Sequence, residues 1–382
     1  MGTAPQVRFA TFGFLPLRAP GWRCRPSGRN ATSQYRFGKG RIVVPCFVRS
    51  QELTKNKLSR TEKTDIVTHN CQFAGWRLPM VYELPVPSMR FDVTLEDGAK
   101  IRVRRHGRPD GVRLFLSHGN GFATDAYFPY WYYLLANFDL VIFDFRNHGQ
   151  NVPVTPANHN YAQLARDLQC VVQEVKARLG EKPTAGLFHS MSARTAMKHA
   201  IEIGWCWDAL VLFDPPNVPP SGHPTYAAME VFEHKLTEWA HQRRRRFAAV
   251  AELAEEYLQS RATVRWVAGA HELMARSVLR KSPAGDEYEL VCDPESEATI
   301  YAQALTLNLW PQASEFGGPV ALIGCDPTMK GAPATGAANQ ALGIEGGYNY
   351  SFVEGTGHLL QIEKPRECIR LTLNFLAQYG LA

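Results

Sequence analysis

The sequence predicts an α/β protein built on a mostly parallel, doubly wound sheet. Two observations predict it: short apolar runs recur along the second part of the chain, and segments with apolar residues at helical spacing separate them. Strands buried on both faces read as continuous apolar runs, and their alternation with helices indicates a parallel sheet covered on both sides. Hydrophobic residues make up 45% of the chain and charged residues 20%, a composition that supplies a core and excludes a disordered or fibrous protein.

The expected elements follow one another in a regular order. An antiparallel hairpin is expected over 89–103, because its two halves alternate around the turn dipeptide Asp97-Gly98. Further strands are expected at 112–117, 140–143, 184–188, 209–213, 320–323 and 348–353. Helices are expected at 125–136, 164–179, 193–203 and 365–379, and the last of them begins at a proline.

The segment 215–316 interrupts this alternation. It has no strand pattern and is rich in helix-forming residues, with helices expected at 226–239, 243–259 and 271–280. We therefore expect a helical cap inserted after the sixth strand, on a core domain formed by 80–214 and 317–382. Four arginines at 243–246 are expected to lie across an exposed face of this cap, balanced by Glu252, Glu255 and Glu256.

Residues 1–79 differ from the rest of the chain in charge. They hold 14 Lys and Arg against three acidic residues and show no sustained apolar period, so no core is expected there. We expect a basic, disordered extension that arises from a mis-assigned start, with Met80 or Met89 as the true beginning; an Arg-rich organelle transit peptide is the alternative. The location expected is cytoplasmic, or organellar in the second case. Because the basic excess lies in this segment, the net charge of +6 does not indicate nucleic-acid binding by the folded body.

The spacing of the cysteines and the length of the apolar runs limit the ligands and partners that the sequence predicts. The eight cysteines show no CxxC or Cys/His spacing typical of a metal site, so neither a metal nor another cofactor is expected. No apolar run approaches the roughly 20 residues that a membrane span requires. The partner expected is a small-molecule substrate, and the sequence leaves the oligomeric state open.

Three residues occur in the order that nucleophilic acyl transfer by a serine requires on a sheet of this kind. Ser190 lies between the strand at 184–188 and a helix, Asp326 follows the strand at 320–323, and His358 follows the last strand in the run Gly-Thr-Gly-His. A serine nucleophile needs a base to accept its proton and a carboxylate to orient that base. We therefore expect Ser190, His358 and Asp326 to form a catalytic triad.

In these motifs the chain resembles the α/β-hydrolase superfamily, specifically its capped serine-hydrolase branch with an HGxG oxyanion loop. Besides the triad order, residues 117–121 read Ser-His-Gly-Asn-Gly and residues 144–149 read Asp-Phe-Arg-Asn-His-Gly. The resemblance covers about 89–380 and implies the α/β-hydrolase fold. It also implies that the backbone N–H groups of Asn120 and Met191 form the oxyanion hole. The chain departs from the family pattern at Phe188, where the turn before the nucleophile usually has a small residue.

Some assignments stay open at this point. Asp214, at the end of the strand 209–213, competes with Asp326 as the triad acid, although we expect it to brace the loop that enters the cap. His118 and His148 are expected to brace loops, and His189 to face away from the nucleophile and support packing.

The function expected is hydrolysis of a small or medium-sized carboxylic ester, thioester or lactone through an acyl-enzyme. A carbon–carbon bond hydrolase with the same triad and a non-catalytic receptor or scaffold are the alternatives.

Overall fold

The computed structural model describes residues 32–37, 40–45 and 81–382, and it divides the chain into two compact units, Met1–Gln72 and Phe73–Ala382. In the first unit, β1 (Thr32–Phe37) pairs antiparallel with β2 (Gly40–Pro45). The remaining expectations for 1–79 lie outside the described residues. Among the helices described, none is both long enough and apolar enough to cross a membrane.

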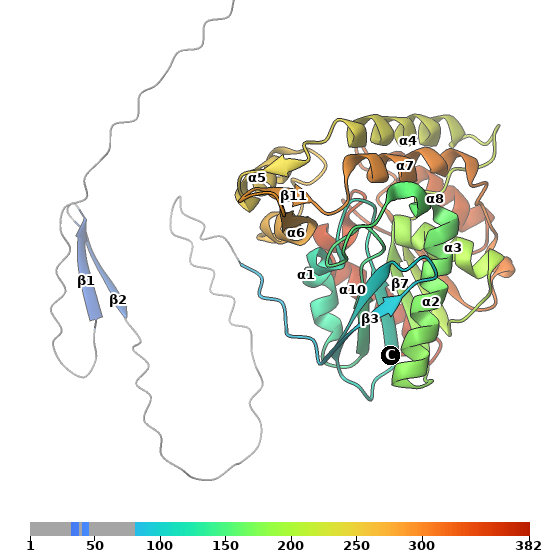
Figure 1. Ribbon diagram of the computed structural model, residues 1–382, viewed down its shortest axis with the longest axis horizontal. Coiled ribbons are helices and arrows are strands. Elements are labelled where there is room, and N and C mark those ends of the chain that lie inside the picture. Colours follow the sequence, from blue (N-terminus) through green and yellow to red (C-terminus); the bar gives the residue numbers. More distant parts are fainter. Residues whose placement is uncertain (1–31, 38–39, 46–80) are drawn as a thin grey trace, which may run out of the picture. The chain divides into compact units, whose positions relative to one another are not determined.

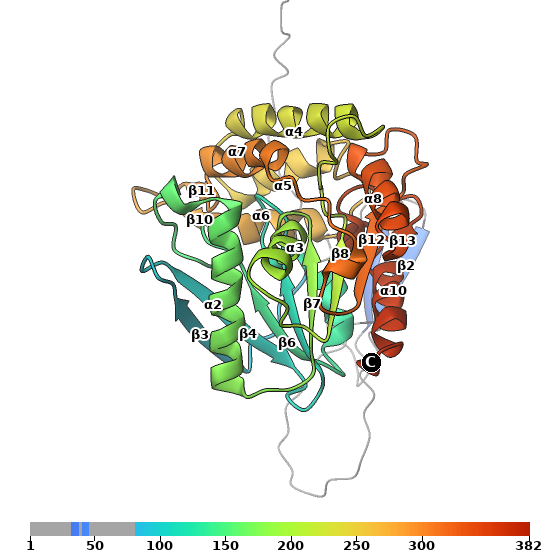
Figure 2. The same ribbon diagram turned by 90° about the vertical axis from the view of Figure 1, so that its right-hand side faces the viewer.

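The second unit is built around an eight-stranded sheet with the order β13-β12-β8-β7-β5-β6-β4-β3 (Figure 2). Its strands are β3 (Met89–Thr94), β4 (Lys100–Gly107), β5 (Arg113–Ser117), β6 (Asp139–Phe143), β7 (Thr184–His189), β8 (Ala209–Phe213), β12 (Val320–Cys325) and β13 (Asn349–Val353). Six neighbouring strands run parallel, whereas β4 pairs antiparallel with both β3 and β6. The expected mostly parallel sheet is confirmed.

Burial explains why these segments form strands. Every residue of β5, β6, β7, β8 and β12 is buried, as a central parallel strand covered on both faces requires. The edge hairpin differs, because buried and more exposed residues mix along β3 and β4. The continuous apolar runs in the sequence therefore correspond to the centre of the sheet, and the alternating runs to its edge.

Helices cover both faces of the sheet and bury a separate core on each side (Figure 1). One face carries α1 (Phe128–Trp131), α9 (Leu360–Glu363) and α10 (Pro365–Ala377), and the other carries α2 (Tyr161–Leu179), α3 (Met191–Glu202) and α8 (Ala334–Glu345). The helix expected at 125–136 is broken into α1 between two short 3₁₀ turns. Pro129 lies in the first turn of α1, where the missing N–H costs no hydrogen bond.

The inserted segment, residues 215–316, lies between β8 and β12. It contains α4 (Tyr226–His241), α5 (Val250–Gln259), α6 (Ala270–Val278) and α7 (Pro294–Gln303), and Figures 1 and 2 both show α4 and α7 side by side across one end of the sheet. It is not wholly helical as expected, because β9 (Arg246–Phe247), β10 (Leu279–Lys281) and β11 (Tyr288–Leu290) form a small antiparallel sheet. Phe247 is buried, and α5 begins only after it, at Val250.

Candidate active site

Ser190 occupies a sharp turn between β7 and α3. Its backbone has φ 53° and ψ −116°, a conformation that a residue with a side chain adopts only under strain. Two hydrogen bonds of Ser192 hold the turn: its hydroxyl donates to the carbonyl of His189 and accepts from the N–H of the same residue, both at 2.9 Å. The context expected of a nucleophile elbow, a strand and a helix joined by a strained turn, is therefore present around Ser190.

Phe188, the unusual residue before this turn, is accommodated in the core between the sheet and the helices α2 and α3. Its ring is fully buried and packs edge-on against Trp207, with ring centroids 5.5 Å apart. Gly186 provides the space, because a Cβ at that position would lie 2.4 Å from the Cε2 atom of Phe188. The missing side chain of Gly186 therefore makes room for the ring of Phe188.

His358 reaches Ser190 from the loop that follows β13. Its Nε2 atom lies 2.8 Å from the Ser190 hydroxyl oxygen, which is hydrogen-bonding distance for a base and its nucleophile. Thr356 orders the loop by donating its hydroxyl to the carbonyl of Val353 at 2.6 Å. Ser190 is buried, while the side chain of His358 keeps about 20% of its surface exposed.

The carboxylate that contacts His358 is Asp214, not Asp326 as the sequence analysis expected. The Oδ2 atom of Asp214 lies 2.6 Å from Nδ1 of His358. The hydroxyl of Thr335 donates to the same oxygen, and the N–H of Cys325 and the amide of Asn339 donate to Oδ1, at 2.7 to 2.9 Å.

These contacts keep Asp214 ionised. Burial alone raises the pKa of this carboxyl, but the hydrogen bond and charge of His358, together with the other donors, outweigh burial and lower the pKa below its ordinary value. Asp214 also has a positive φ of 43°, so Asp214 and Ser190 both lie on strained turns.

Asp326 has a different role in the fold. Its Oδ1 accepts from both the N–H and the hydroxyl of Thr328, and its Oδ2 accepts from the N–H of Gly355 at 2.7 Å. These bonds, with that of Gly355 the largest, lower the pKa of Asp326. Asp326 therefore braces the loop that carries His358, whereas Asp214, which we had expected to brace the loop that enters the cap, contacts the base.

Two neutral histidines fix the loop after β5, as expected. The N–H of Phe145 donates to Nε2 of His118, so Nδ1 carries the proton and donates to the carbonyl of Gly119. His148 is arranged in the same way between the N–H of Gly121 and the carbonyl of Arg146. Burial is the main cause that lowers the pKa of both imidazoles, which favours these neutral forms.

Two backbone N–H groups near Ser190 have no acceptor in the described part of the chain, one on this loop and one at the start of α3. Within residues 81–382, no acceptor takes the N–H of Asn120. The N–H of Met191 is at the first position of α3, where a helix offers no acceptor. The two residues expected to form an oxyanion hole thus flank Ser190 with unpaired donors.

The inserted segment contacts the same loop through α7. The side-chain amide of Asn120 donates to the carbonyl of Glu297 at 2.8 Å. The carboxylate of Glu297 packs on Gly121, since a Cβ there would lie 2.3 Å from its Oε1. Arg243 forms a buried ion pair with this carboxylate, so it does not lie on an exposed face as expected. Arg244 is exposed, as expected, and its guanidinium pairs with Glu252 and Glu256.

The comparisons with known proteins agree with this architecture. Residues 114–371 match the α/β hydrolase family. The chain belongs to that family. No curated protein matches the sequence.

Similar solved structures share the fold with this hydrolase at low sequence identity. An E-2-(acetamidomethylene)succinate hydrolase is 17% identical, with 76% of this chain and 99% of that chain covered at a TM-score of 0.59. A thioesterase domain from the curacin biosynthetic pathway is 19% identical, with 75% and 99% covered at 0.56. A thermophilic esterase from Thermogutta terrifontis is 16% identical, with 76% and 99% covered at 0.57.

One cluster in this hydrolase has the composition of a metal site. The ligand atoms of His148, His159 and Cys292 lie within 4.8 Å of one another and are buried. However, Nε2 of His148 already accepts the N–H of Gly121, and burial raises the pKa of the Cys292 thiol well above its ordinary value. These side chains therefore suit a brace for the loop after β5 better than a metal site, and we assign no metal to them.

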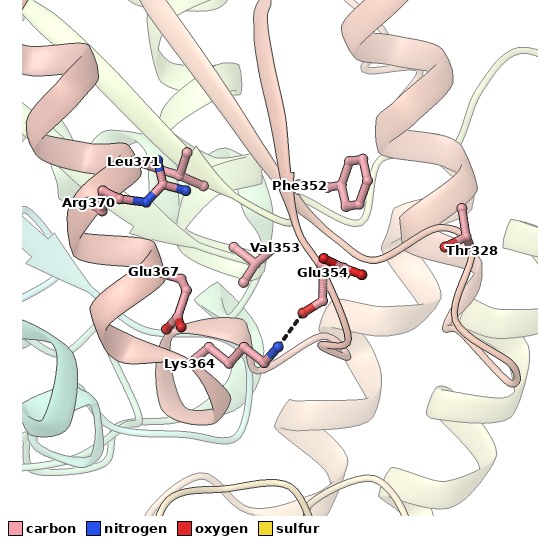
Figure 3. Close-up of a pocket in the computed structure, with 8 residues that line it drawn as sticks. All are labelled: Thr328, Phe352, Val353, Glu354, Lys364, Glu367, Arg370 and Leu371. Carbon is pink, nitrogen blue, oxygen red and sulfur yellow. Dashed lines mark hydrogen bonds between the residues drawn. The ribbon is translucent and has the colours of Figure 1, made fainter.

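A surface hollow lies beside β13 and α10, away from the nucleophile (Figure 3). Its walls include Thr328, Glu354 and Lys364, and the ammonium of Lys364 donates to the carbonyl of Glu354 at 2.7 Å. Neither Ser190 nor His358 lines it. The hollow adjoins the Asp326 loop and is not part of the Ser190 cluster.

Several residues around Ser190 were not identified from the sequence. Thr335 donates to Asp214 and Glu297 packs on Gly121, both from segments that no motif marks. His189 was expected to face away, but its ring lies against that of His358, with centroids 4.8 Å apart at 46°. The only signal in the sequence was its position beside Ser190.

Proposed function

We propose that this hydrolase cleaves a small or medium-sized carboxylic ester, thioester or lactone through an acyl-enzyme formed on Ser190. The observation that supports it most strongly is the continuous chain of hydrogen bonds from the Ser190 hydroxyl through His358 to Asp214, at 2.8 and 2.6 Å. Such a chain is what a serine nucleophile needs to lose its proton at neutral pH.

In this mechanism, Nε2 of His358 accepts the proton of the Ser190 hydroxyl as its oxygen attacks the substrate carbonyl. The ionised Asp214 holds the imidazole with its proton on Nδ1 and stabilises the imidazolium that forms. The N–H groups of Asn120 and Met191 donate to the oxyanion. His358 then protonates the leaving alcohol or thiol, and it later removes a proton from the water that hydrolyses the acyl-enzyme.

The inserted segment acts as a cap in this proposal. It is joined to the core by the buried pair of Arg194 with Glu233, and by Arg265 with Glu363, whose Oε2 also accepts the N–H of Gly357 next to the base. A cap tied to the residues beside the nucleophile and the base limits the size of the substrate and excludes water from the site.

A serine-directed probe tests the proposal. The chain is expected to react with a fluorophosphonate and to hydrolyse p-nitrophenyl esters of graded acyl length. Ser190→Ala should abolish labelling and lower kcat by roughly 10⁴- to 10⁶-fold, with an unchanged melting temperature.

Ser282→Ala is the matched control, since that hydroxyl lies in an exposed turn where it accepts from the N–H of Ala284. It should behave like the parent. A parent protein that resists the probe and leaves every ester intact would favour the scaffold alternative, and a Ser190→Ala variant as active as the parent would exclude an acyl-enzyme on this residue.

A further inference from the structure

His189 is a fully buried imidazole next to the nucleophile, and the mechanism above does not use it. We propose that His189 and Tyr127 are positioning residues that connect the oxyanion loop to the general base. The inference rests on the proposed function, because it assigns a role in placing the groups that perform acyl transfer.

The hydrogen bonds of His189 have only one consistent direction. Its Nε2 atom lies 2.8 Å from the backbone carbonyl of His358, and a carbonyl only accepts, so Nε2 carries a proton. Burial, together with the neighbouring His358, lowers the pKa of His189 to about 3, so the ring is neutral and Nδ1 has no proton. Nδ1 is therefore the acceptor of the Tyr127 hydroxyl, which lies 2.7 Å away.

The chain of donors continues into the oxyanion loop. The oxygen of Tyr127 accepts the N–H of Gly119 at 3.1 Å. Gly119 precedes Asn120, whose free N–H is one of the proposed oxyanion donors. The N–H of Gly119 donates to Tyr127, the hydroxyl of Tyr127 donates to His189, and Nε2 of His189 donates to the carbonyl of His358. Each donor in this chain therefore has one acceptor.

This arrangement fixes the distance between two parts of the site that come from distant segments. The oxyanion loop follows β5, and the base follows β13, which is not a neighbour of β5 in the sheet. His189 ends β7 between them and bonds to the backbone of the base directly and to the loop through Tyr127. A rigid, neutral ring here also adds no positive charge beside the imidazolium that forms on His358 during attack.

Three substitutions separate this positioning role from simple packing. Tyr127→Phe removes the hydroxyl that bonds both to the N–H of Gly119 and to Nδ1 of His189, and leaves the imidazole in place. His189→Leu removes both connections, whereas His189→Gln keeps an N–H donor that reaches the carbonyl of His358. Tyr348→Phe is the matched control, because it also removes a buried tyrosine hydroxyl. That hydroxyl donates to the carbonyl of Pro311 at 2.7 Å, in a different part of the core.

The measurements are kcat and KM for a p-nitrophenyl ester and the rate of fluorophosphonate labelling. A misplacement of reacting groups by about 1 Å costs on the order of 100-fold in rate, so Tyr127→Phe and His189→Leu should lower kcat and labelling by about 10- to 100-fold. KM should change by no more than about twofold, because the loss falls on the transition state. His189→Gln should recover part of the activity that His189→Leu loses.

Two results would overturn the inference while the parent remains active: a Tyr127→Phe variant that loses no more kcat than Tyr348→Phe, or a His189→Gln variant no more active than His189→Leu. If His189→Leu does not fold, the comparison of Tyr127→Phe with Tyr348→Phe decides. A parent that is inert to the probe and to all esters would instead overturn the proposed function, and this inference with it.

Discussion

Asp214 and His358 are 144 residues apart in the sequence, yet the carboxylate of the first lies 2.6 Å from Nδ1 of the second. The hydrogen bonds of the two carboxylates explain the contact. Asp214 follows β8, the direct neighbour of β7, and donors from Cys325, Thr335 and Asn339 hold its carboxylate toward the base. The donors at Asp326 come from Thr328 and Gly355, which direct its carboxylate into its own loop.

We predict that Asp214→Asn lowers kcat by roughly 10³- to 10⁴-fold and leaves the protein folded. An amide does not supply the charge that stabilises the His358 imidazolium, and its NH₂ group favours the wrong tautomer of the ring. Steady-state hydrolysis of a p-nitrophenyl ester, together with circular dichroism, checks the prediction.

Asp326→Asn is the matched control for this substitution. It should cost less than about tenfold in kcat, because it loosens only the brace to Gly355, and its main effect should be a lower melting temperature. If Asp326→Asn proved the inactive variant and Asp214→Asn kept near-normal turnover, the acid in the proposed mechanism would have to be Asp326 despite its distance from the base.

The sequence predicted the parts of this site that depend on local patterns. Ser190 and His358 were found because a buried strand, a tight turn and a helix leave a recognisable pattern over a few residues. The choice between Asp214 and Asp326 depends on the hydrogen bonds that orient each carboxylate, and for Asp214 these come from residues more than 100 positions away in the sequence.

The segment behind Asp326 shows the same limit. Residues 330–338 are rich in Gly, Ala and Pro, yet α8 begins at Ala334. Its Thr335 and Asn339 are buried and donate to Asp214. Packing against the sheet stabilises this helix despite the two glycines in it, and that contribution is absent from any local pattern.

We predict that Glu233→Gln lowers the free energy of unfolding by about 3 to 5 kcal/mol, because it leaves the buried guanidinium of Arg194 without a counter-charge. Arg194 lies on α3 one turn after Ser190, and its Nη2 atom is 2.6 Å from Oε1 of Glu233 on α4. Both side chains are almost fully buried. Urea denaturation gives the difference.

A second pair on α3 is the control for this measurement. Lys198 and Glu202 also form an ion pair, but the side chain of Glu202 is about half exposed. Glu202→Gln should change stability by less than about 1 kcal/mol. Equal losses in the two variants would show that burial does not decide the contribution of these pairs, and the anchoring role given to Glu233 would be lost.

The last prediction concerns acid stability, and it follows from the buried neutral histidines. Burial lowers the pKa of His106, His159 and His199 to about 4, and that of His189 to about 3. In the unfolded chain these groups bind protons at about pH 6.5, so between that pH and about 4 the unfolded state holds more protons than the folded state.

Stability is therefore fully present above about pH 6.5 and is lost as the pH falls toward 4, by about 1.4 kcal/mol per pH unit for each such histidine.

The substitution His199→Gln isolates the contribution of one of these histidines. Nε2 of His199 donates to Oε1 of Gln169 at 2.6 Å, and a glutamine keeps an N–H donor while it removes the titrating group. Urea midpoints measured from pH 7.5 to 4.5 should show the same dependence in parent and variant above pH 7. Below pH 6 the free energy of unfolding of the variant should fall less steeply than that of the parent, by about 1.4 kcal/mol per pH unit. Parallel curves over the whole range would mean that His199 binds its proton equally in both states, and that the acid sensitivity has another source.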